Sequence, residues 1–433
     1  MDRRTFISVS AFAAAAPLVG GPAMAQRAPI PTQPKKPTRA ERLGEAMLAN
    51  RMALDFDGTH FSGTGYDWLL RRGSEADAFL LGEEHGIAEN PKLAAQLFAA
   101  LTQHRYRHIA VEISPPMAAV VNRALASRNS DELPKLLTTP ESRIAFFGLR
   151  EEADWLRSAR WSLPGRSPFL WGMDYEVGAD RYLIRQLQQR PKPPAAARAL
   201  SVLAAASSAS WAKYEETHNP QYIFSFAGDP KLVQAVRAAW PNADANSAVI
   251  LETLEQTLAI NALWVAKQGY DSNLLRSKLM RANLYRYWTA KPPRDRLFMK
   301  MGASHLVRGL SMTDVFDLGT AVPELVGERG GESFHLLVLP GPGTQTANLD
   351  PTKFIYVPGN RDQYGEGMDL FDKSVIPGKF TIFDTAPLRR LASSNAGDVP
   401  LPLWRVIHGF DAVLIMTGSH PSSNLYDPRA SST

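Results

Sequence analysis

The stretch AFLLGEEHGIAEN, residues 78–90, decides the fold class of this 433-residue chain. An uninterrupted apolar run ends at Gly82, and Glu83, Glu84 and His85 follow at once. A short apolar run that ends at a glycine is typical of a buried strand, because glycine lets the chain turn sharply. Two carboxylates and a histidine at such a point indicate that this end of the strand faces a pocket.

Three more segments have the same form, an apolar strand that ends in polar residues. They are 107–112, 168–174 and 296–302, and the polar residues at or just beyond their ends are Glu112, Asp174, Glu176 and His305. In an open parallel sheet, the carboxyl ends of the strands meet at one edge, where ligands bind. We therefore expect these polar residues to form one site with Glu83, Glu84 and His85.

Strand and helix alternate along most of the chain, which predicts an α/β fold with a largely parallel, or mixed, sheet flanked by helices. Helical periodicity is found at 39–54, 90–104, 115–127 and 151–160. The remaining strands are expected at 334–341, 380–384 and 411–416. The Gly-, Asp- and Pro-rich residues 341–377 are expected to form long loops.

The middle of the chain differs from this alternation. Residues 194–218 and 247–287 are rich in Ala, Leu, Arg and Gln and predict long amphipathic helices. We interpret them as a helical insertion over about 180–290 within one α/β domain at 41–425. The last eight residues, 426–433, are expected to be a flexible tail.

Residues 1–25 have the form of a secretory signal peptide. Arg3 and Arg4 precede a weakly apolar run that closes with Ala-Met-Ala. The paired arginines resemble a twin-arginine signal, so we expect the twin-arginine export machinery as a partner. An uncleaved membrane anchor is the alternative, but the apolar run is short and rich in Ala and Gly. We expect cleavage before Gln26, a linker at 26–40, and a periplasmic or secreted bacterial protein.

The composition is that of a globular protein with ample core, 45% hydrophobic and 21% charged. No cysteine occurs, which excludes disulfides, thiolate metal ligands and a cysteine nucleophile. A net charge of +5 without a long Lys/Arg block does not favour nucleic-acid binding. Beyond the leader, we expect no segment long and apolar enough to span a membrane.

The residue types of the expected site limit its chemistry. A histidine between carboxylates is held in one tautomer and can take a proton from water. Two histidines with carboxylates can instead hold a divalent metal. Taken singly, each residue also has a structural interpretation, such as a helix cap or an acid in a first helical turn. The residues alone leave these alternatives open.

The motifs, in their order, resemble those of the erythromycin esterase-like proteins, within the Tiki, TraB and ChaN superfamily. LLGEEHG followed by Glu89 is similar to the first histidine motif, IAVE to a strand that ends in glutamate, and WGMDYE to a strand that ends in Gly-x-Asp. LLRSKLMRANLYRYW, which contains Arg276, resembles the helix before the last motif, and FMKMGASHLVRG resembles the strand that leads to the second histidine. FDAVLIM resembles the last strand, so the resemblance spans about 79–416. One departure is Ala88, which stands where that branch usually has an arginine.

The resemblance implies roles for individual residues. His85 would be the general base that activates water, Glu83 and Glu112 would orient it, and His305 would assist. Glu84 and Asp174 complete the implied catalytic set, and the implied substrate-binding residues are Glu89, Glu176 and Arg276.

The leading hypothesis is an exported hydrolase that cleaves a small-molecule ester or lactone with histidine-activated water and requires no cofactor. The first alternative is a haem- or metal-binding envelope protein resembling ChaN, in which His85 and His305 are ligands. The second alternative is a metallopeptidase of the Tiki/TraB type, with a divalent metal.

Overall fold

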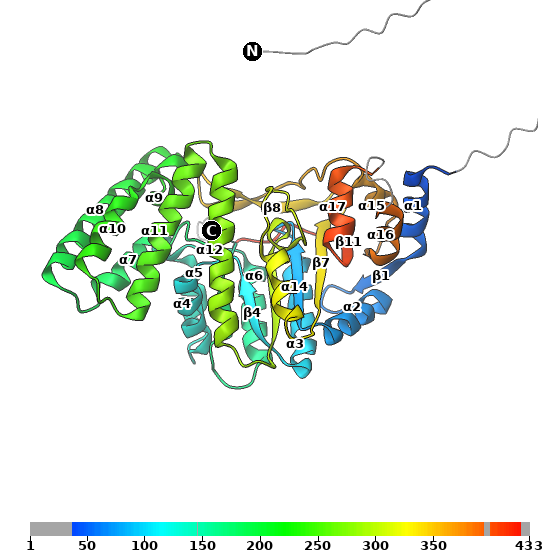
Figure 1. Ribbon diagram of the computed structural model, residues 1–433, viewed down its shortest axis with the longest axis horizontal. Helices are drawn as coiled ribbons and strands as arrows, with labels where there is room; N and C mark the ends of the chain where they lie inside the picture. The colour runs from blue at the N-terminus through cyan, green and yellow to red at the C-terminus, as the bar shows by residue number, and fades with distance from the viewer. Residues whose placement is uncertain (1–36, 145, 394–398, 426–433) are drawn as a thin grey trace, which may run out of the picture. The chain divides into compact units, whose positions relative to one another are not determined.

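The computed structural model describes residues 37–144, 146–393 and 399–425 (Figure 1). The predicted leader at 1–25, most of the predicted linker and the predicted tail at 426–433 lie outside the described residues.

A nine-stranded sheet in the order β2-β1-β10-β11-β7-β3-β6-β4-β5 forms the centre of the described chain. Its strands are β1 (Arg51–Phe56), β2 (Phe61–Ser62), β3 (Ala78–Glu83), β4 (Tyr106–Val111), β5 (Leu170–Gly172), β6 (Arg296–Gly302), β7 (Ser333–Pro340), β10 (Phe380–Asp384) and β11 (Ala412–Met416). The run from β11 to β5 is parallel, whereas β2, β1, β10 and β11 pair antiparallel. The predicted α/β fold with a largely parallel, mixed sheet is confirmed.

Helices cover both faces of this sheet. They are α1 (Arg39–Ala49), α2 (Gly63–Glu75), α3 (Glu89–Leu101), α4 (Pro115–Ala126), α5 (Glu132–Thr138), α6 (Arg150–Ser162), α13 (Ala303–Leu306), α14 (Leu318–Gly327), α15 (Asp369–Lys373), α16 (Ala386–Ser393) and α17 (Leu401–Gly409). Phe79 and Leu81 of β3 pack with apolar residues of α3 and α6, whereas Ala78 and Leu80 pack with those of α14. Both faces of β3 are therefore buried, which explains its continuous apolar run.

The strand register brings distant strand ends together. Glu83 at the end of β3 pairs with Gly302 at the end of β6, and Val111 of β4 pairs with Lys300 of β6 and Gly172 of β5. Residues that lie more than two hundred positions apart in sequence therefore meet at the carboxyl edge of the sheet.

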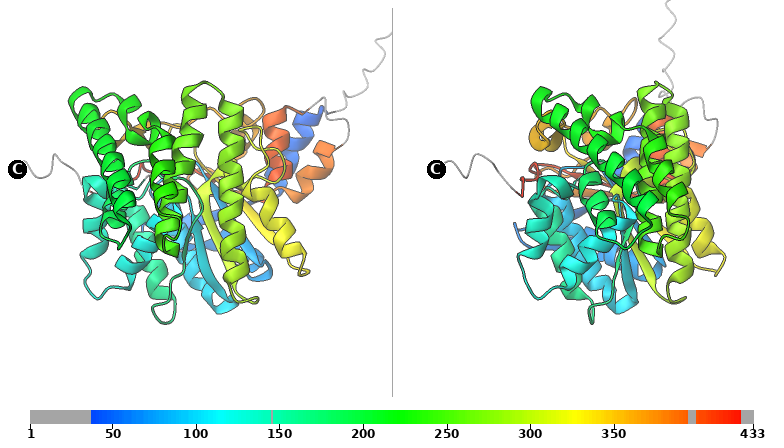
Figure 2. Two further views of the ribbon diagram at one scale, coloured as in Figure 1. Left: turned by 60° about the vertical axis from the view of Figure 1, so that its left-hand side comes forward. Right: turned by 90° about the vertical axis from the view of Figure 1, so that its left-hand side faces the viewer.

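Between β5 and β6, the chain forms a group of helices. They are α7 (Asp180–Gln188), α8 (Pro194–Thr217), α9 (Phe224–Ala227), α10 (Pro230–Ala239), α11 (Ala245–Val265) and α12 (Gly269–Ala290). The helices α8 to α12, drawn in green, lie together in both views of Figure 2. Their chain returns to the sheet at β6, so α12 delivers Arg276 next to the strand ends.

One of these helices corrects an expectation about membrane spans. Among the described residues, α11 is long and apolar enough by length and composition to cross a membrane. Of its most apolar window, 44% is buried in the protein, and α11 packs against α10, α12 and α4. The buried core helix of a globular protein can have the same length and apolar composition, so these two properties of α11 are only weak evidence that it spans a membrane.

Two segments differ from the sequence-based expectation. The helix expected at 39–54 ends at Ala49, and β1 follows, because Met52, Leu54 and Phe56 alternate with more polar neighbours at the period of a strand. The expected loops at 341–377 contain a two-stranded sheet of β8 (Gln345–Asp350) and β9 (Ile355–Asn360), and also α15.

Candidate active site

A cavity of about 610 Å³ opens at the carboxyl ends of β3, β4 and β6. Six of the residues predicted for the site line it: Glu83, Glu84, His85, Glu112, Arg276 and His305. The lining also includes the apolar side chains of Met312, Leu337, Leu339, Met368 and Val406. One cavity therefore combines charged residues and histidines with apolar side chains.

His85 is fixed by contacts on both ring nitrogens and on its face. Nδ1 lies 2.9 Å from Oε1 of Glu83, and Nε2 lies 3.5 Å from Oε2 of Glu112. The ring stacks on Phe146 with centroids 3.7 Å apart. The side chain keeps 27% of its surface exposed, so the imidazole is held rigidly yet is open to the cavity.

Glu112 is the central carboxylate of the site. Oε2 accepts a hydrogen bond of 2.9 Å from the backbone N–H of Gly302, and Oε1 accepts one of 2.7 Å from Arg276. Nε2 of His305 lies 3.5 Å from Oε1, so Glu112 lies between the two histidines. A single carboxylate therefore couples the charges of His85, His305 and Arg276.

His305 and Arg276 are themselves held from behind. Nδ1 of His305 lies 2.7 Å from Oδ2 of Asp317, and Nε of Arg276 donates to Oδ1 of Asp174 over 2.9 Å. A second nitrogen of Arg276 also bonds to Asp174. Asp174 thus acts on the site through Arg276, as Asp317 does through His305.

The charged neighbours change the protonation of the two histidines. Burial lowers the pKa of His85, but the hydrogen bonds and charges of Glu112 and Glu83 outweigh it and raise the pKa to about 10. Burial and Arg276 lower the pKa of His305, whereas Glu112 and Asp317 raise it, with a net increase to about 9. At neutral pH both imidazoles are therefore cationic, and their charges hold the pKa of Glu112 well below its usual value.

Lys300 is a component of the site that the sequence analysis missed. Its side chain is 2% exposed, and its ammonium group donates to Oε1 of Glu83 over 2.8 Å and to Oε1 of Glu152 over 2.5 Å. Glu83 also accepts from Asn90. The available signal was the lysine in the otherwise apolar strand sequence RLFMKMG, because a lysine inside a buried strand needs a carboxylate partner.

Three predicted residues make other contacts. Glu84 accepts hydrogen bonds from the backbone N–H of Asp362 and from the hydroxyl of Tyr364, and all three residues line the cavity. Glu89 bonds to the backbone and ring of His420 and lines a different cavity.

Glu176 also lies outside the lining of the site cavity. Its carboxylate accepts hydrogen bonds from Ser114 and from the backbone N–H groups of Gly178 and Ala179. Burial raises the pKa of Glu176 to about 7. These contacts fix the chain after β5, which is where Asp174 is positioned.

The donor set does not match a metal site. Within 37–144, 146–393 and 399–425, no group of three or more His, Cys, Asp or Glu side chains is arranged to hold a metal ion. Both ring nitrogens of His85 face carboxylates, and Nδ1 of His305 is bonded to Asp317.

Comparisons with known proteins identify the fold. No protein-family model matches the chain, and no curated protein matches it. Among solved structures, a mutant of erythromycin esterase EreC in its open conformation matches with a TM-score of 0.58 at 15% sequence identity, over 87% of this chain and 100% of that chain.

Two further solved structures match to the same degree. A protein from Bacillus cereus matches with a TM-score of 0.58 at 13% identity, over 90% of this chain and 100% of that one. A succinoglycan biosynthesis protein matches with a TM-score of 0.57 at 13% identity, over 88% of this chain and 98% of that one. At this level of identity the likeness is one of fold, and the chain has the erythromycin esterase-like fold that its motifs predicted.

Proposed function

We propose that this protein hydrolyses an ester or lactone by direct attack of water, with His85 as the general base. The observation that carries the proposal is the imidazole of His85, open to a cavity and held by Glu83 on Nδ1, with Nε2 beside Glu112. Such an arrangement fixes the tautomer that accepts a proton on Nε2.

The reaction follows from these contacts. Nε2 of neutral His85 takes a proton from water while the water oxygen attacks the carbonyl carbon. The carbonyl oxygen becomes an oxyanion, which the cationic ring of His305 stabilises. The intermediate collapses, the carbon–oxygen ester bond breaks, and the leaving alkoxide takes the proton from His85. The products are a carboxylic acid and an alcohol.

The lining of the cavity supports a substrate with an apolar body. Met312, Leu337, Leu339 and Met368 line the same cavity as the charged residues. An ester or lactone with a bulky aliphatic part would place this part against these apolar side chains and its carbonyl near His85. We further propose that the protein acts in the periplasm or is secreted, on the strength of its N-terminal sequence.

The first test is His85→Ala, assayed against a panel of esters and lactones. We expect a loss in kcat/KM of about 10³-fold or more, because the variant lacks the base and the group that protonates the leaving alkoxide. The matched control is His60→Ala, since the side chain of His60 is 74% exposed and lies outside the lining of the cavity.

A second measurement separates the hydrolase from the metal- and haem-binding alternatives. We expect the native mass to equal that of the polypeptide, with no visible chromophore. Full activity in His85→Ala, or a bound metal or haem that is lost when His85 and His305 are both changed, would contradict the proposal.

A further inference from the structure

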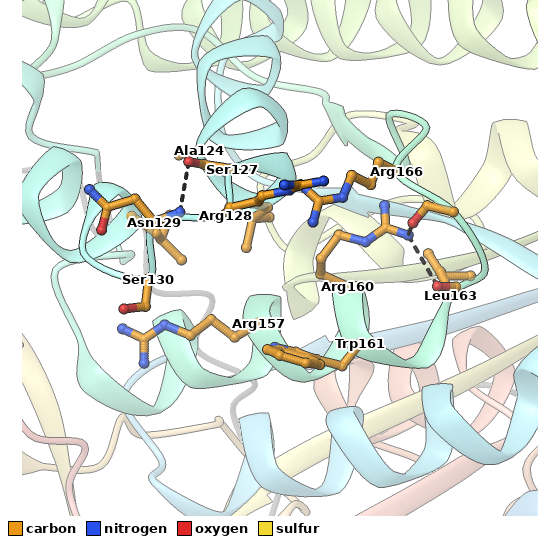
Figure 3. Close-up of a pocket in the computed structure, with 13 residues that line it drawn as sticks. Ala124, Ser127, Arg128, Asn129, Ser130, Arg157, Arg160, Trp161, Leu163 and Arg166 are labelled. Atoms are coloured by element: carbon orange, nitrogen blue, oxygen red, sulfur yellow. Dashed lines mark hydrogen bonds between the residues drawn. The ribbon is translucent and has the colours of Figure 1, made fainter.

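A second cavity, of about 470 Å³, lies between the C-terminal ends of α4 and α6 and the start of α5 (Figure 3). Four arginines line this arginine pocket: Arg128, Arg157, Arg160 and Arg166. The remaining lining residues are neutral, and none of them is Asp or Glu.

The pocket is at the opposite edge of the sheet from the candidate active site. The loop that follows α6 leads directly into β5, and Asn122 of α4 bonds to the backbone of Phe169 and Leu170 at the start of that strand. The active-site cavity lies at the carboxyl ends of the strands. A ligand of the arginine pocket is therefore separate from the substrate of the proposed hydrolysis.

The positive charges of the pocket are poorly compensated. Arg157 pairs with Asp154 over 2.9 Å, but the other three arginines have no carboxylate partner within the described part of the chain. Burial lowers the pKa of Arg160, and the charge of Arg166 lowers it further, so these two guanidinium groups are close enough to repel each other. Three cations without a counter-charge favour a multiply charged anion.

The surrounding backbone is held in place by two of these arginines. Arg160 donates to the carbonyl oxygens of Ser167 over 2.9 Å and Gly165 over 2.7 Å. Arg166 donates to the carbonyl of Ala126 at the C-terminal end of α4. The loop that carries Arg166 is thus bound to both helices, and the pocket is preorganised.

Arg128 and Trp161 differ from the rest of the lining. Arg128 has no side-chain hydrogen bond or ion pair among the described residues, so all its donors are available. Trp161 is 86% exposed, and Figure 3 shows its ring on the same side of the pocket as Arg157. Leu125, Leu133 and Leu163 supply apolar wall. An exposed indole beside arginines suits a ligand with both a charge and an apolar or aromatic part.

We propose that the arginine pocket binds an organic phosphate, with the phosphate on Arg128 and Arg166 and an apolar or aromatic body against Trp161 and the leucines. Arginine guanidinium groups match phosphate oxygens in pairs, and a phosphate monoester carries about two negative charges against the three unpaired cations. A lipid headgroup and a soluble phosphate ester share this chemistry.

Isothermal titration of the mature protein tests the proposal with phenyl phosphate, inorganic phosphate and benzoate. We expect phenyl phosphate to bind most tightly and its affinity to fall with added salt. Arg128→Gln should weaken binding about tenfold or more, because a charge-assisted hydrogen bond is lost from a residue with no structural partner. Trp161→Ser should weaken phenyl phosphate but not inorganic phosphate.

Matched controls are Arg198→Gln, an exposed arginine on α8, and Trp264→Ser, a tryptophan that is 57% exposed. Both should leave the affinity for phenyl phosphate unchanged. Co-sedimentation with phosphatidylcholine vesicles, with and without phosphatidylglycerol, separates the two sources of phosphate. If the protein binds the anionic vesicles and Arg128→Gln abolishes this binding, the ligand is a lipid headgroup. If the protein binds phenyl phosphate but not the vesicles, the ligand is a soluble phosphate ester.

Ester hydrolysis is measured in parallel and should be the same in Arg128→Gln as in the unchanged protein. The binding measurement does not depend on the proposed hydrolase activity, so the two proposals fail separately. The proposal is overturned if phenyl phosphate does not bind at millimolar concentration, or if Arg128→Gln and Arg198→Gln have equal effects.

Discussion

The protonation of His85 is set by two single residues, Glu83 and Glu112, one at each ring nitrogen. Because they raise its pKa to about 10, only a small fraction of His85 is neutral at neutral pH. The neutral form is the one that accepts a proton from water. At any pH below the pKa, the neutral fraction increases about tenfold for each unit by which the pH is raised. The rate of the proposed reaction should therefore increase with pH.

We therefore predict an alkaline pH optimum for kcat/KM. His305 loses its positive charge above a pKa of about 9, so the profile should be bell-shaped with its maximum between about 9 and about 10. Glu112→Gln removes one carboxylate that raises the pKa of His85, and should move the acid limb to lower pH. A rate that is flat between about pH 6 and about pH 8 would contradict this assignment of the base.

Lys300 should contribute to stability through two buried partners. Lys300→Met leaves Glu83 and Glu152 buried without their cation, and should lower the free energy of unfolding by about 3–5 kcal/mol. The double variant of Lys300→Met and Glu152→Gln should lose less free energy of unfolding than the sum of the two single losses. The reason is that Glu152→Gln removes one of the two carboxylates left without a cation. Urea denaturation followed by circular dichroism measures all three variants.

The control for this cycle is Lys278→Met, since Lys278 is exposed on α12. Its effect should be within about 0.5 kcal/mol of zero. Strictly additive losses for Lys300→Met and Glu152→Gln would mean that the two side chains do not act as a pair.

At the scale of elements, the end of β6 must approach β3 and β4 closely for the site to form. A Cβ on Gly302 would lie 3.0 Å from Nε2 of His85 and 3.3 Å from Oε2 of Glu112. The backbone of Gly302 has φ −51°, which any residue adopts, so an alanine there affects the site rather than the backbone.

Gly302→Ala should therefore reduce kcat about 10²-fold with little loss of stability, because a methyl group displaces the imidazole from its position. Gly44→Ala on α1 is the control, since no atom lies within 4 Å of its added Cβ. Activity and the thermal midpoint are measured together. A fully active Gly302→Ala variant would show that His85 does not need the space beside Gly302. A variant that unfolds at room temperature would show that Gly302 is needed for the fold rather than for the site.

For the whole molecule, the twin-arginine form of the N-terminal sequence predicts folding before export. Replacing Arg3 and Arg4 with lysines should leave the protein in the cytoplasm with its leader attached. Mass spectrometry of the periplasmic fraction checks the prediction, with an expected first residue near Gln26. A replacement of Lys35 and Lys36, in the predicted linker, by glutamine is the control and should not change export.

The local pattern of the sequence was sufficient for the strands β3 to β7, β10 and β11, for the helices α1, α3, α4, α6, α8, α11 and α12, and for the polar strand ends, but not for β1, β2, β8 and β9. Short apolar runs identify these buried strands, with a glycine at the end of β3 and of β6, and the position of His85, Glu112 and His305 at or after the strand ends needed no tertiary information. The same reasoning failed at 51–56, where a short strand follows a helix directly, because helical and strand periods are hard to separate over six residues.

The sequence by itself determined which residues reach the carboxyl edge of the sheet, since that depends on neighbours in the chain. Only the tertiary structure decided which of them pair. Strand register joins Lys300 to Glu83, and helix packing brings Glu152 and Arg276 to the same edge, while Glu89 and Glu176 face other partners. A side-chain pair across more than a hundred residues depends on ångström-scale packing of separate elements, and no local pattern of residues carries that information.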